Sequence, residues 1–392
     1  MFIKKRWECW NKNMFYIDNT EDLVNICNEI VANTNIIALD TEFIKQKEYF
    51  PTLSIIQLSF FNGQIIKNCI IDVLAENFCL DSFFEILSNE KIKKIFHSCS
   101  QDLEALYFIS KKIPVGIEDT QVMAEFCGMK SNLSYKDLVK DTLKVVIEKS
   151  KKVQTSDWLQ RPLSEKQLNY AIGDVDYLLE MYIYLAQQLD KNKTFKYYKA
   201  EMNERYGKNM IQNLINNSWK KMRFKLGNKT NIYMIILKRL CILREKIAME
   251  ENVIKNSILP DNFFKVLLTE QPKTIAELNE VFADDVEIMN KSKDIKRIFL
   301  NEYNAILEQI KSENIEEKPY ITELKNRSLL QKLEEMNDYI IAKCKQLDIN
   351  PEVVQNKGDL IAFLTDSEKI EDLFAKWKIE LFGKRLKEIK AR

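Results

Sequence analysis

Two carboxylates directly follow a short apolar run near the start of the chain. Residues 36–39 are Ile-Ile-Ala-Leu, and Asp40-Thr41-Glu42 comes next. A continuous apolar run of this length predicts a strand that is buried on both faces. Side chains alternate along a strand, so Asp40 and Glu42 would share one face. Neighbouring carboxylates repel each other, so either a divalent cation joins them or the strand end reaches water and both are solvated.

A third carboxylate, Asp102, follows another predicted strand at residues 94–96. The intervening serines predict the start of a helix, with Ser98 or Ser100 as its N-cap. Asp102 would then lie in the first helical turn, where the helix dipole favours a negative charge. It is either a metal ligand or a residue that only stabilises the helix terminus.

Tyr170 and Asp174 form the next candidate pair. Ser164 and Gln167 have the spacing of a capping box, which predicts that a helix begins there. Tyr170 and Asp174 are four residues apart and would lie on one face of that helix. Alternatively, Tyr170 is a half-buried core residue and Asp174 is solvated.

Brought together, Asp40, Glu42, Asp102 and Asp174 would hold up to two divalent cations through oxygen. Two cations about 3.5–4 Å apart can activate a water and stabilise the leaving oxygen of a phosphodiester. A tyrosine pKa near 10 makes Tyr170 a poor base at neutral pH, so we expect it to position the attacking water. Spacing alone does not bring the segments together.

Composition excludes several other classes of protein. The 392 residues are 46% hydrophobic and 30% charged, which predicts two or three ordinary soluble domains. No apolar stretch reaches the roughly 18 residues of a membrane helix. Residues 1–13 lack the pattern of a secretory signal, and Met14 could be the true start. There is no P-loop and no GxGxxG motif, so no nucleotide cofactor is expected.

The cysteine and histidine content restricts the metal. None of the eight cysteines forms a CxxC pair, which argues against zinc and disulfides and for a reducing cytoplasm. His97 is the one histidine of the sequence, so a histidine-rich site is excluded. A metal here must be held by oxygen, which suits Mg²⁺ or Mn²⁺.

Charge is divided unevenly along the chain. Residues 1–190 sum to −6 and residues 191–392 to +7. Residues 191–240 hold 13 lysines and arginines against two glutamates. This pattern suits a polyanionic ligand that one part grips and another processes. The alternative is that a lysine-rich composition places lysine on any solvated helix.

The elements that must position these residues follow from periodicity. Residues 15–17 predict a strand, and a helix begins at Asn19 or Thr20. Residues 54–60 and 64–73 predict two strands around an Asn-Gly turn, so a three-stranded meander is expected with the strand that ends at Glu42. After Asp190 the patterns are helical, with a charged linker at residues 311–319.

Several motifs, in order, resemble a known family. Residues 40–43 (DTEF), 97–103 (HSCSQDL) and 170–174 (YAIGD) resemble the three motifs of the DEDDy 3′→5′ exonucleases. Within that group, residues 119–121 (DTQ), 124–128 (AEFCG) and 157–164 (DWLQRPLS) are similar to the ribonuclease D family. The basic segment at 219–223 also resembles that family, and residues 237–278 resemble its HRDC helical domain.

The resemblance implies an RNase H-like α/β exonuclease domain, a mixed sheet flanked by helices, followed by two all-α HRDC-type domains. The expected organisation is an N-terminal extension (1–13), the exonuclease domain (14–200), a basic connecting segment (201–229), an HRDC domain (230–310) and a second HRDC-like domain (320–392).

The resemblance also implies an activity. It is the hydrolysis of single-stranded RNA 3′ ends to nucleoside 5′-monophosphates by a two-metal mechanism with Mg²⁺ or Mn²⁺, usually in tRNA 3′ maturation. Asp40, Glu42 and Asp174 would hold the metal that carries the nucleophile. Asp40 would bridge to a second metal that Asp102 supports, and Tyr170 would orient the nucleophile. The basic residues expected to bind RNA are Lys220, Lys221, Arg223 and Lys225.

Two other functions compete with this one. The same motifs and HRDC helices occur in DNA-processing proteins, so a DNA exonuclease is an alternative, although no polymerase or helicase motor is visible in the sequence. A non-catalytic RNA-binding protein could also retain the fold, but the intact carboxylates argue against it. His97 is expected to pack or hydrogen-bond, without a catalytic role.

Overall fold

The computed structural model describes residues 14–148, 150–222, 230–354 and 356–392. These residues form two compact units. Unit 1 comprises the described residues up to 46, residues 51–208 and residues 339–354. Unit 2 comprises residues 47–50, the described part of 209–338, and residues 356–392. Within the described ranges, no helix is long and apolar enough to cross a membrane.

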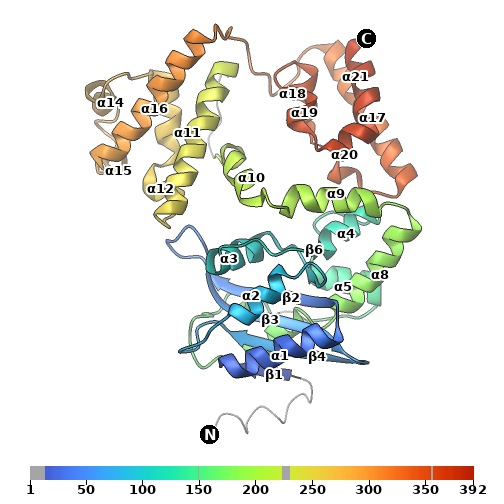
Figure 1. Ribbon diagram of the computed structural model, residues 1–392. Coiled ribbons are helices and arrows are strands. Elements are labelled where there is room, and N and C mark those ends of the chain that lie inside the picture. The colour runs from blue at the N-terminus through green and yellow to red at the C-terminus, as the bar shows by residue number, and fades with distance from the viewer. Residues whose placement is uncertain (1–13, 149, 223–229, 355) are drawn as a thin grey trace. The chain divides into compact units, whose positions relative to one another are not determined.

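Unit 1 is built on a mixed sheet of six described strands (Figure 1). Their order across the sheet is β1-β4-β3-β2-β5-β6. The predicted meander is confirmed, because β2, β3 and β4 pair antiparallel, while β1 pairs parallel to β4 and β5 parallel to β2 and β6. The strands are β1 (Met14–Ile17), β2 (Ile36–Ile44), β3 (Thr52–Asn62), β4 (Ile65–Asp72), β5 (Lys93–Phe96) and β6 (Ile117–Asp119).

The strand β2 lies inside the sheet, between β3 and β5. Ile37, Ala38 and Leu39 are completely buried, as the apolar run predicts. Its neighbours on both sides hydrogen-bond to it, so its backbone is fixed along the length that precedes Asp40. The carboxylates at its end therefore start from a rigid element.

Nine described helices belong to unit 1 before residue 208. The first begins at Thr20, as predicted, and the side chain of its N-cap residue, Asn19, accepts a hydrogen bond from the Asp22 N–H. The helices are α1 (Thr20–Asn33), α2 (Asp81–Ser88), α3 (Ser100–Ser110), α4 (Thr120–Phe126), α5 (Tyr135–Leu143), α6 (Lys151–Gln154), α7 (Glu165–Gly173), α8 (Leu178–Lys191) and α9 (Phe195–Tyr206). Leu168, Ala171 and Ile172 of α7 pack on the sheet residues Ile55 and Ile70.

A late segment of the chain also belongs to unit 1. It contains the end of α17 (Arg327–Leu347) and the short 3₁₀ helix η2 (Pro351–Val353). The Asn350 N–H donates to the Glu125 carbonyl at 2.8 Å, and its side-chain amide donates to the Met129 carbonyl at 2.7 Å. Residues 320–392 are expected to form one HRDC-like domain, whereas the structure assigns residues 339–354 to unit 1.

Unit 2 is helical. Its elements are α10 (Met210–Asn216), η1 (Ser218–Lys221), α11 (Asn231–Glu250), α12 (Lys255–Ile258), α13 (Asp261–Glu270), α14 (Ile275–Val281), α15 (Val286–Met289), α16 (Lys293–Ser312), the start of α17, α18 (Lys357–Leu364), α19 (Ile370–Leu373), α20 (Lys376–Lys378), η3 (Ile379–Gly383) and α21 (Lys384–Ala391). Helix α16 continues to Ser312, so the predicted linker begins two residues later than expected. An apolar core joins α11, α13, α14 and α16.

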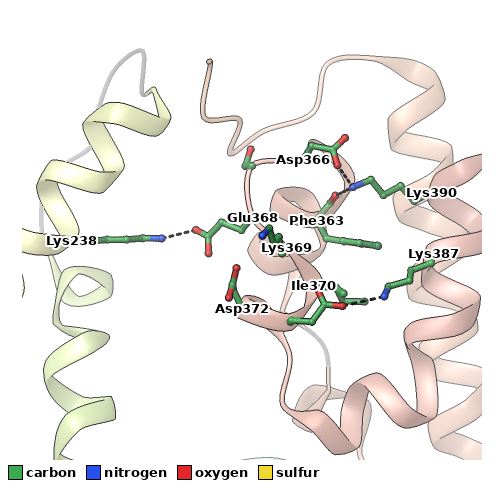
Figure 2. Close-up of a pocket in the computed structure, with 11 residues that line it drawn as sticks. Lys238, Phe363, Asp366, Glu368, Lys369, Ile370, Asp372, Lys387 and Lys390 are labelled. Atoms are coloured by element: carbon green, nitrogen blue, oxygen red, sulfur yellow. Dashed lines mark hydrogen bonds and ion pairs between the residues drawn. The ribbon is translucent and has the colours of Figure 1, made fainter. Parts of the chain in front are cut away.

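A pocket of about 590 Å³ lies within unit 2, between α11 and the last helical block (Figure 2). Lys238 forms an ion pair with Glu368 at 2.8 Å, and the Tyr320 hydroxyl donates to the same carboxylate at 2.7 Å. Lys387 forms another pair with Glu371 at 3.1 Å. Cations and carboxylates thus neutralise each other along the walls, and the pocket lacks the excess positive charge that a polyanion requires.

Candidate active site

Asp40 and Glu42 extend from the end of the buried part of β2. They are two residues apart on one strand, so their side chains leave the same face. A β-bulge follows directly, between Glu42 and Phe43. Both carboxylates are half-buried. The predicted alternation along the strand therefore brings the two carboxylates to one side of the sheet.

Asp174 and Tyr170 come from α7, which begins with the predicted capping box. The Ser164 side chain accepts from the Gln167 N–H, and the Gln167 side chain accepts from the Ser164 N–H. Asp174 is the C-cap residue of this helix and is buried, whereas Tyr170 is half-buried. The helix start is therefore defined locally by its own sequence.

The loop before α7 is fastened to the sheet by Arg161. Its guanidinium donates to both oxygens of Asp72, at 2.7 and 2.6 Å, and to the Ser54 carbonyl at 3.2 Å. The Tyr16 hydroxyl donates to the same Asp72 carboxylate. Burial raises the pKa of Asp72, but the hydrogen bonds from Arg161 and Tyr16 outweigh it and lower that pKa below its ordinary value. The start of α7 is thus held against β3 and β4.

Three of the predicted carboxylates meet. Ligand oxygens of Asp40, Glu42 and Asp174 all lie within 4.8 Å of one another. They line one pocket of about 410 Å³ together with Asp102 and Tyr170. All five predicted catalytic side chains therefore face the same pocket, although Asp102 stands outside the three-carboxylate cluster among the described residues.

Asp102 is held by a neighbour that the sequence did not indicate. The Thr41 hydroxyl donates to its carboxylate at 2.5 Å. Burial raises the pKa of Asp102 to about 6, although the hydrogen bond from Thr41 opposes this shift. Thr41 lies between Asp40 and Glu42 in β2, so its side chain leaves the other face of the strand. Its hydrogen bond to Asp102 links β2 to α3.

The predicted serine cap of α3 is wrong. Cys99 is the N-cap residue and makes no side-chain cap hydrogen bond, and Ser100 is already helical. Instead, the buried Asp119 carboxylate accepts from the Ser98 and Cys99 N–H groups at 2.9 and 3.1 Å. A distant carboxylate thus holds the two residues that precede the helix. The sequence indicated Asp119 only as part of a family motif.

His97 also lines the pocket. One ring nitrogen lies 3.0 Å from the Thr120 hydroxyl and the other 3.1 Å from the Leu133 carbonyl. Both nitrogens are therefore engaged with the protein, in keeping with the packing role expected for this residue. Tyr135 is a further lining residue that no sequence signal indicated, and its hydroxyl accepts from the Tyr177 N–H at 3.1 Å.

The Tyr170 phenol lies close to the carboxylates of Glu42 and Asp40. Burial, and then the charges of Glu42 and Asp40, raise the pKa of Tyr170 well above its ordinary value. Its phenol therefore keeps its proton at neutral pH and can donate a hydrogen bond. A protonated phenol is a poor general base, and the positioning role expected for Tyr170 stays a prediction.

The donor set of the cluster fits a hard divalent cation. Every candidate ligand of Asp40, Glu42 and Asp174 is a carboxylate oxygen. Oxygen ligands suit Mg²⁺ and Mn²⁺, and three carboxylates this close need positive charge to offset their repulsion. These three residues could therefore hold one cation, and Asp102 lines the same pocket.

The predicted RNA-binding residues lie on unit 2 or outside the described ranges. Lys220 and Lys221 end η1 and are exposed. Arg223 and Lys225 lie outside the described residues. Trp219 precedes the two lysines in η1, and the Lys238 ammonium lies over its ring, 4.7 Å from the ring centre.

Comparison with known proteins identifies the family. A 3′-5′ exonuclease family model matches residues 14–190. Ribonuclease D of Bartonella henselae is 29% identical over 97% of this chain and 91% of its own length. Ribonuclease D of Haemophilus influenzae is 30% identical over 77% of this chain and 76% of its own length. The chain belongs to the ribonuclease D family.

As a ribonuclease D family member, the chain is a 3′-5′ exoribonuclease. The fold agrees with this. The crystal structure of Escherichia coli RNase D, an exoribonuclease involved in structured RNA processing, matches 95% of this chain and 97% of its own with a TM-score of 0.70 and 22% identity. The predicted fold class is confirmed: a mixed sheet flanked by helices, then a largely helical region consistent with HRDC domains.

Proposed function

We propose that this member of the ribonuclease D family shortens single-stranded 3′ ends of RNA by one nucleotide at a time, including those of tRNA precursors, and releases nucleoside 5′-monophosphates. The observation that carries the proposal is the cluster of Asp40, Glu42 and Asp174, with oxygens within 4.8 Å of one another, in the pocket that Tyr170 lines. A pocket of about 410 Å³ suits the terminal nucleotide of a chain rather than a duplex.

The proposed cofactors are two divalent cations, Mg²⁺ or Mn²⁺. Asp40, Glu42 and Asp174 would hold one of them, and Asp40 would share the second with Asp102. When bound, the cations would lower the pKa of the attacking water and stabilise the leaving 3′ oxygen. The support for the first site is the carboxylate cluster, and the support for the second is the position of Asp102 in the same pocket.

The chain's own residues would orient the reaction. Water attacks the last phosphodiester phosphorus, the bond from phosphorus to the 3′ oxygen breaks, and the shortened RNA leaves with a 3′ hydroxyl. Tyr170 retains its proton because its pKa is raised, so its hydroxyl can donate to the attacking water and direct a lone pair at phosphorus. Thr41 keeps Asp102 in place through their hydrogen bond.

We further propose that the basic residues Lys220, Lys221, Arg223 and Lys225 bind the RNA backbone and that the protein works in the cytoplasm. The exposed positions of Lys220 and Lys221 support the first proposal. The second is supported by the seven described cysteines, all of which are free thiols, as expected in a reducing compartment.

The decisive experiment uses a 5′-labelled RNA hairpin with a single-stranded 3′ tail, sampled over time and resolved on a gel with Mg²⁺, with Mn²⁺ and with chelator. The matching DNA hairpin serves as control. We expect a metal-dependent ladder that shortens from the 3′ end and stops near the duplex, on RNA alone. Released products should co-migrate with nucleoside 5′-monophosphates.

The other outcomes identify the competing functions. Digestion of DNA alone would favour the DNA-processing alternative. Retained RNA binding without digestion under any metal would favour a non-catalytic RNA-binding protein. Digestion that continues unchanged in chelator would contradict the role proposed for the carboxylate cluster.

A further inference from the structure

One buried side chain beside the carboxylate cluster has no partner within the described chain. Gln57 is completely buried in β3, and neither its amide nitrogen nor its amide oxygen makes a hydrogen bond to any described residue. A buried primary amide can donate two hydrogen bonds and accept two, and leaving them unmade is costly. Such a group in a native core calls for a specific explanation.

The register of the sheet places Gln57 directly beside Asp40. The two residues are cross-strand partners in the antiparallel pair of β2 and β3, so their side chains leave the same face. Ile70 lies opposite Gln57 on its other side, and α7 covers this face. Gln57 does not line the pocket that contains the three carboxylates, and its side chain is completely buried beside Asp40.

The next polar residues on the same face complete their hydrogen bonds. The Ser59 hydroxyl donates to the Asn68 side chain at 2.6 Å. The Asn68 amide in turn donates to Asp176 at 2.5 Å. The unmade hydrogen bonds are therefore specific to the position beside Asp40 and are not a general property of this buried polar row.

We propose that Gln57 is a positioning residue of the metal site, whose amide nitrogen donates to the Asp40 carboxylate when that carboxylate holds a cation. Cβ atoms of cross-strand partners are about 5 Å apart, within reach of a glutamine side chain. A carboxylate oxygen has two lone pairs, so an oxygen that binds a metal can still accept one hydrogen bond. Partners of this kind fix a ligand's orientation. The inference rests on the metal role proposed for Asp40.

The test is the substitution Gln57→Met, which keeps the length and approximate volume of the side chain without its polar atoms. Mn²⁺ affinity is measured by isothermal titration calorimetry on the full chain, and the melting temperature is measured in chelator. We expect the Mn²⁺ dissociation constant to rise about tenfold, the usual size of such effects. The melting temperature in chelator should stay the same or rise, because an unpaired amide has been removed. In RNA assays, kcat should fall while KM stays unchanged.

Ser59→Ala is the matched control, two residues along on the same strand face. It removes a hydrogen bond that is made, so it should lower the melting temperature and leave Mn²⁺ affinity unchanged. A Gln57→Met variant that binds Mn²⁺ like the wild type would overturn the inference. A lower melting temperature in chelator would also overturn it, because Gln57 would then serve the fold.

A third variant separates this inference from the proposed function. Asp40→Asn should abolish tight Mn²⁺ binding. If it does so while Gln57→Met binds normally, only the positioning role fails. If Asp40→Asn itself binds Mn²⁺ like the wild type, the proposed metal site fails and the role of Gln57 fails with it.

Discussion

At the scale of single residues, the pocket combines side chains from several elements of unit 1. Asp102 is fixed by Thr41, and Tyr170 packs beside Trp158 with their ring centres 6.1 Å apart. Asp40, Glu42 and Asp174 are brought together by two different elements although their charges repel. Removing one of these groups should therefore change chemistry more than folding.

Asp40→Asn should reduce the rate of RNA hydrolysis by about 10³-fold or more, because a cation supplies several kcal/mol of transition-state stabilisation and this ligand is central to it. The dissociation constant for RNA, measured by fluorescence anisotropy in Ca²⁺, should change less than about threefold. Asp18→Asn, at an exposed residue that does not line the pocket, is the matched control. A wild-type rate for Asp40→Asn would contradict the metal assignment.

Tyr170→Phe should lower kcat by about 10²-fold and leave KM nearly unchanged, because it removes the hydrogen bond that orients the water but keeps the ring. The melting temperature should stay within about 2 °C of the wild type, since the ring still packs against Trp158. Single-turnover kinetics on the tailed hairpin would measure this. An equal loss from Tyr135→Phe, another pocket tyrosine, would mean that the effect is not specific to Tyr170.

At the scale of elements, the site depends on how α7 is attached to the sheet. The capping box sets where the helix begins, and Arg161 anchors the preceding loop to Asp72 at the end of β4. Both Tyr170 and Asp174 take their positions from this attachment. A change at Arg161 should therefore reduce stability and disturb the site without touching the pocket.

Arg161→Met should lower the free energy of unfolding at pH 7 by about 2 kcal/mol, because it leaves the buried Asp72 carboxylate without its cation; the figure allows for partial exposure of the arginine. The folded pKa of Asp72 is depressed, so its contribution is present above the ordinary pKa and is lost as pH falls through the folded value. The difference between variant and wild type should therefore shrink below about pH 4.

Urea unfolding at pH 7 and pH 3.5 would measure this difference. Lys166→Met, at an exposed residue of α7, should give no difference at either pH. A difference for Arg161→Met that is as large at pH 3.5 as at pH 7 would mean that the guanidinium acts through packing and not through Asp72.

Sequence reasoning recovers the elements whose cause is local. The apolar run before Asp40 and the capping box of α7 depend on neighbouring residues, and both were predictable. The hydrogen bond from Thr41 to Asp102 joins residues 61 positions apart, so no spacing rule indicates it. Gln57 becomes notable only when the strand register places it beside Asp40. Asp119, which lies about 20 residues further along the chain, accepts from the two amides that precede the α3 helix, and no local pattern predicts this contact.

At the scale of the whole molecule, the carboxylates proposed to bind metal and two of the lysines proposed to bind RNA belong to different units. The carboxylate cluster lies in unit 1, while Lys220 and Lys221 lie in unit 2. The pocket of Figure 2 is internally neutralised by pairs such as Lys238 with Glu368, so it does not add to the basic surface. Binding and hydrolysis should therefore respond to different substitutions.

The double variant Lys220→Gln/Lys221→Gln should weaken binding of single-stranded RNA and reduce its dependence on salt. Each phosphate contact contributes about 0.7 to the slope of log affinity against log salt on single strands, so two contacts should reduce the slope by about 1.4. Anisotropy titrations between 50 and 300 mM KCl would measure it. Lys325→Gln/Lys332→Gln is a control of equal charge in unit 2, and an equal change there would point to net charge alone.

The segment around Asn350 affects the order in which the protein can be completed. It supplies the Glu125 carbonyl and the Met129 carbonyl of unit 1 with donors, yet the ribosome makes it long after the sheet. Because translation adds about 5–20 residues per second, the earlier residues of unit 1 lack these partners for many seconds. Translation that stops early, for example on a truncated messenger, therefore yields a chain with every catalytic carboxylate but an unfinished unit 1. A segment made late in translation thus contributes to the unit that contains the carboxylate cluster, so this unit is completed only after most of the helical unit has been synthesised.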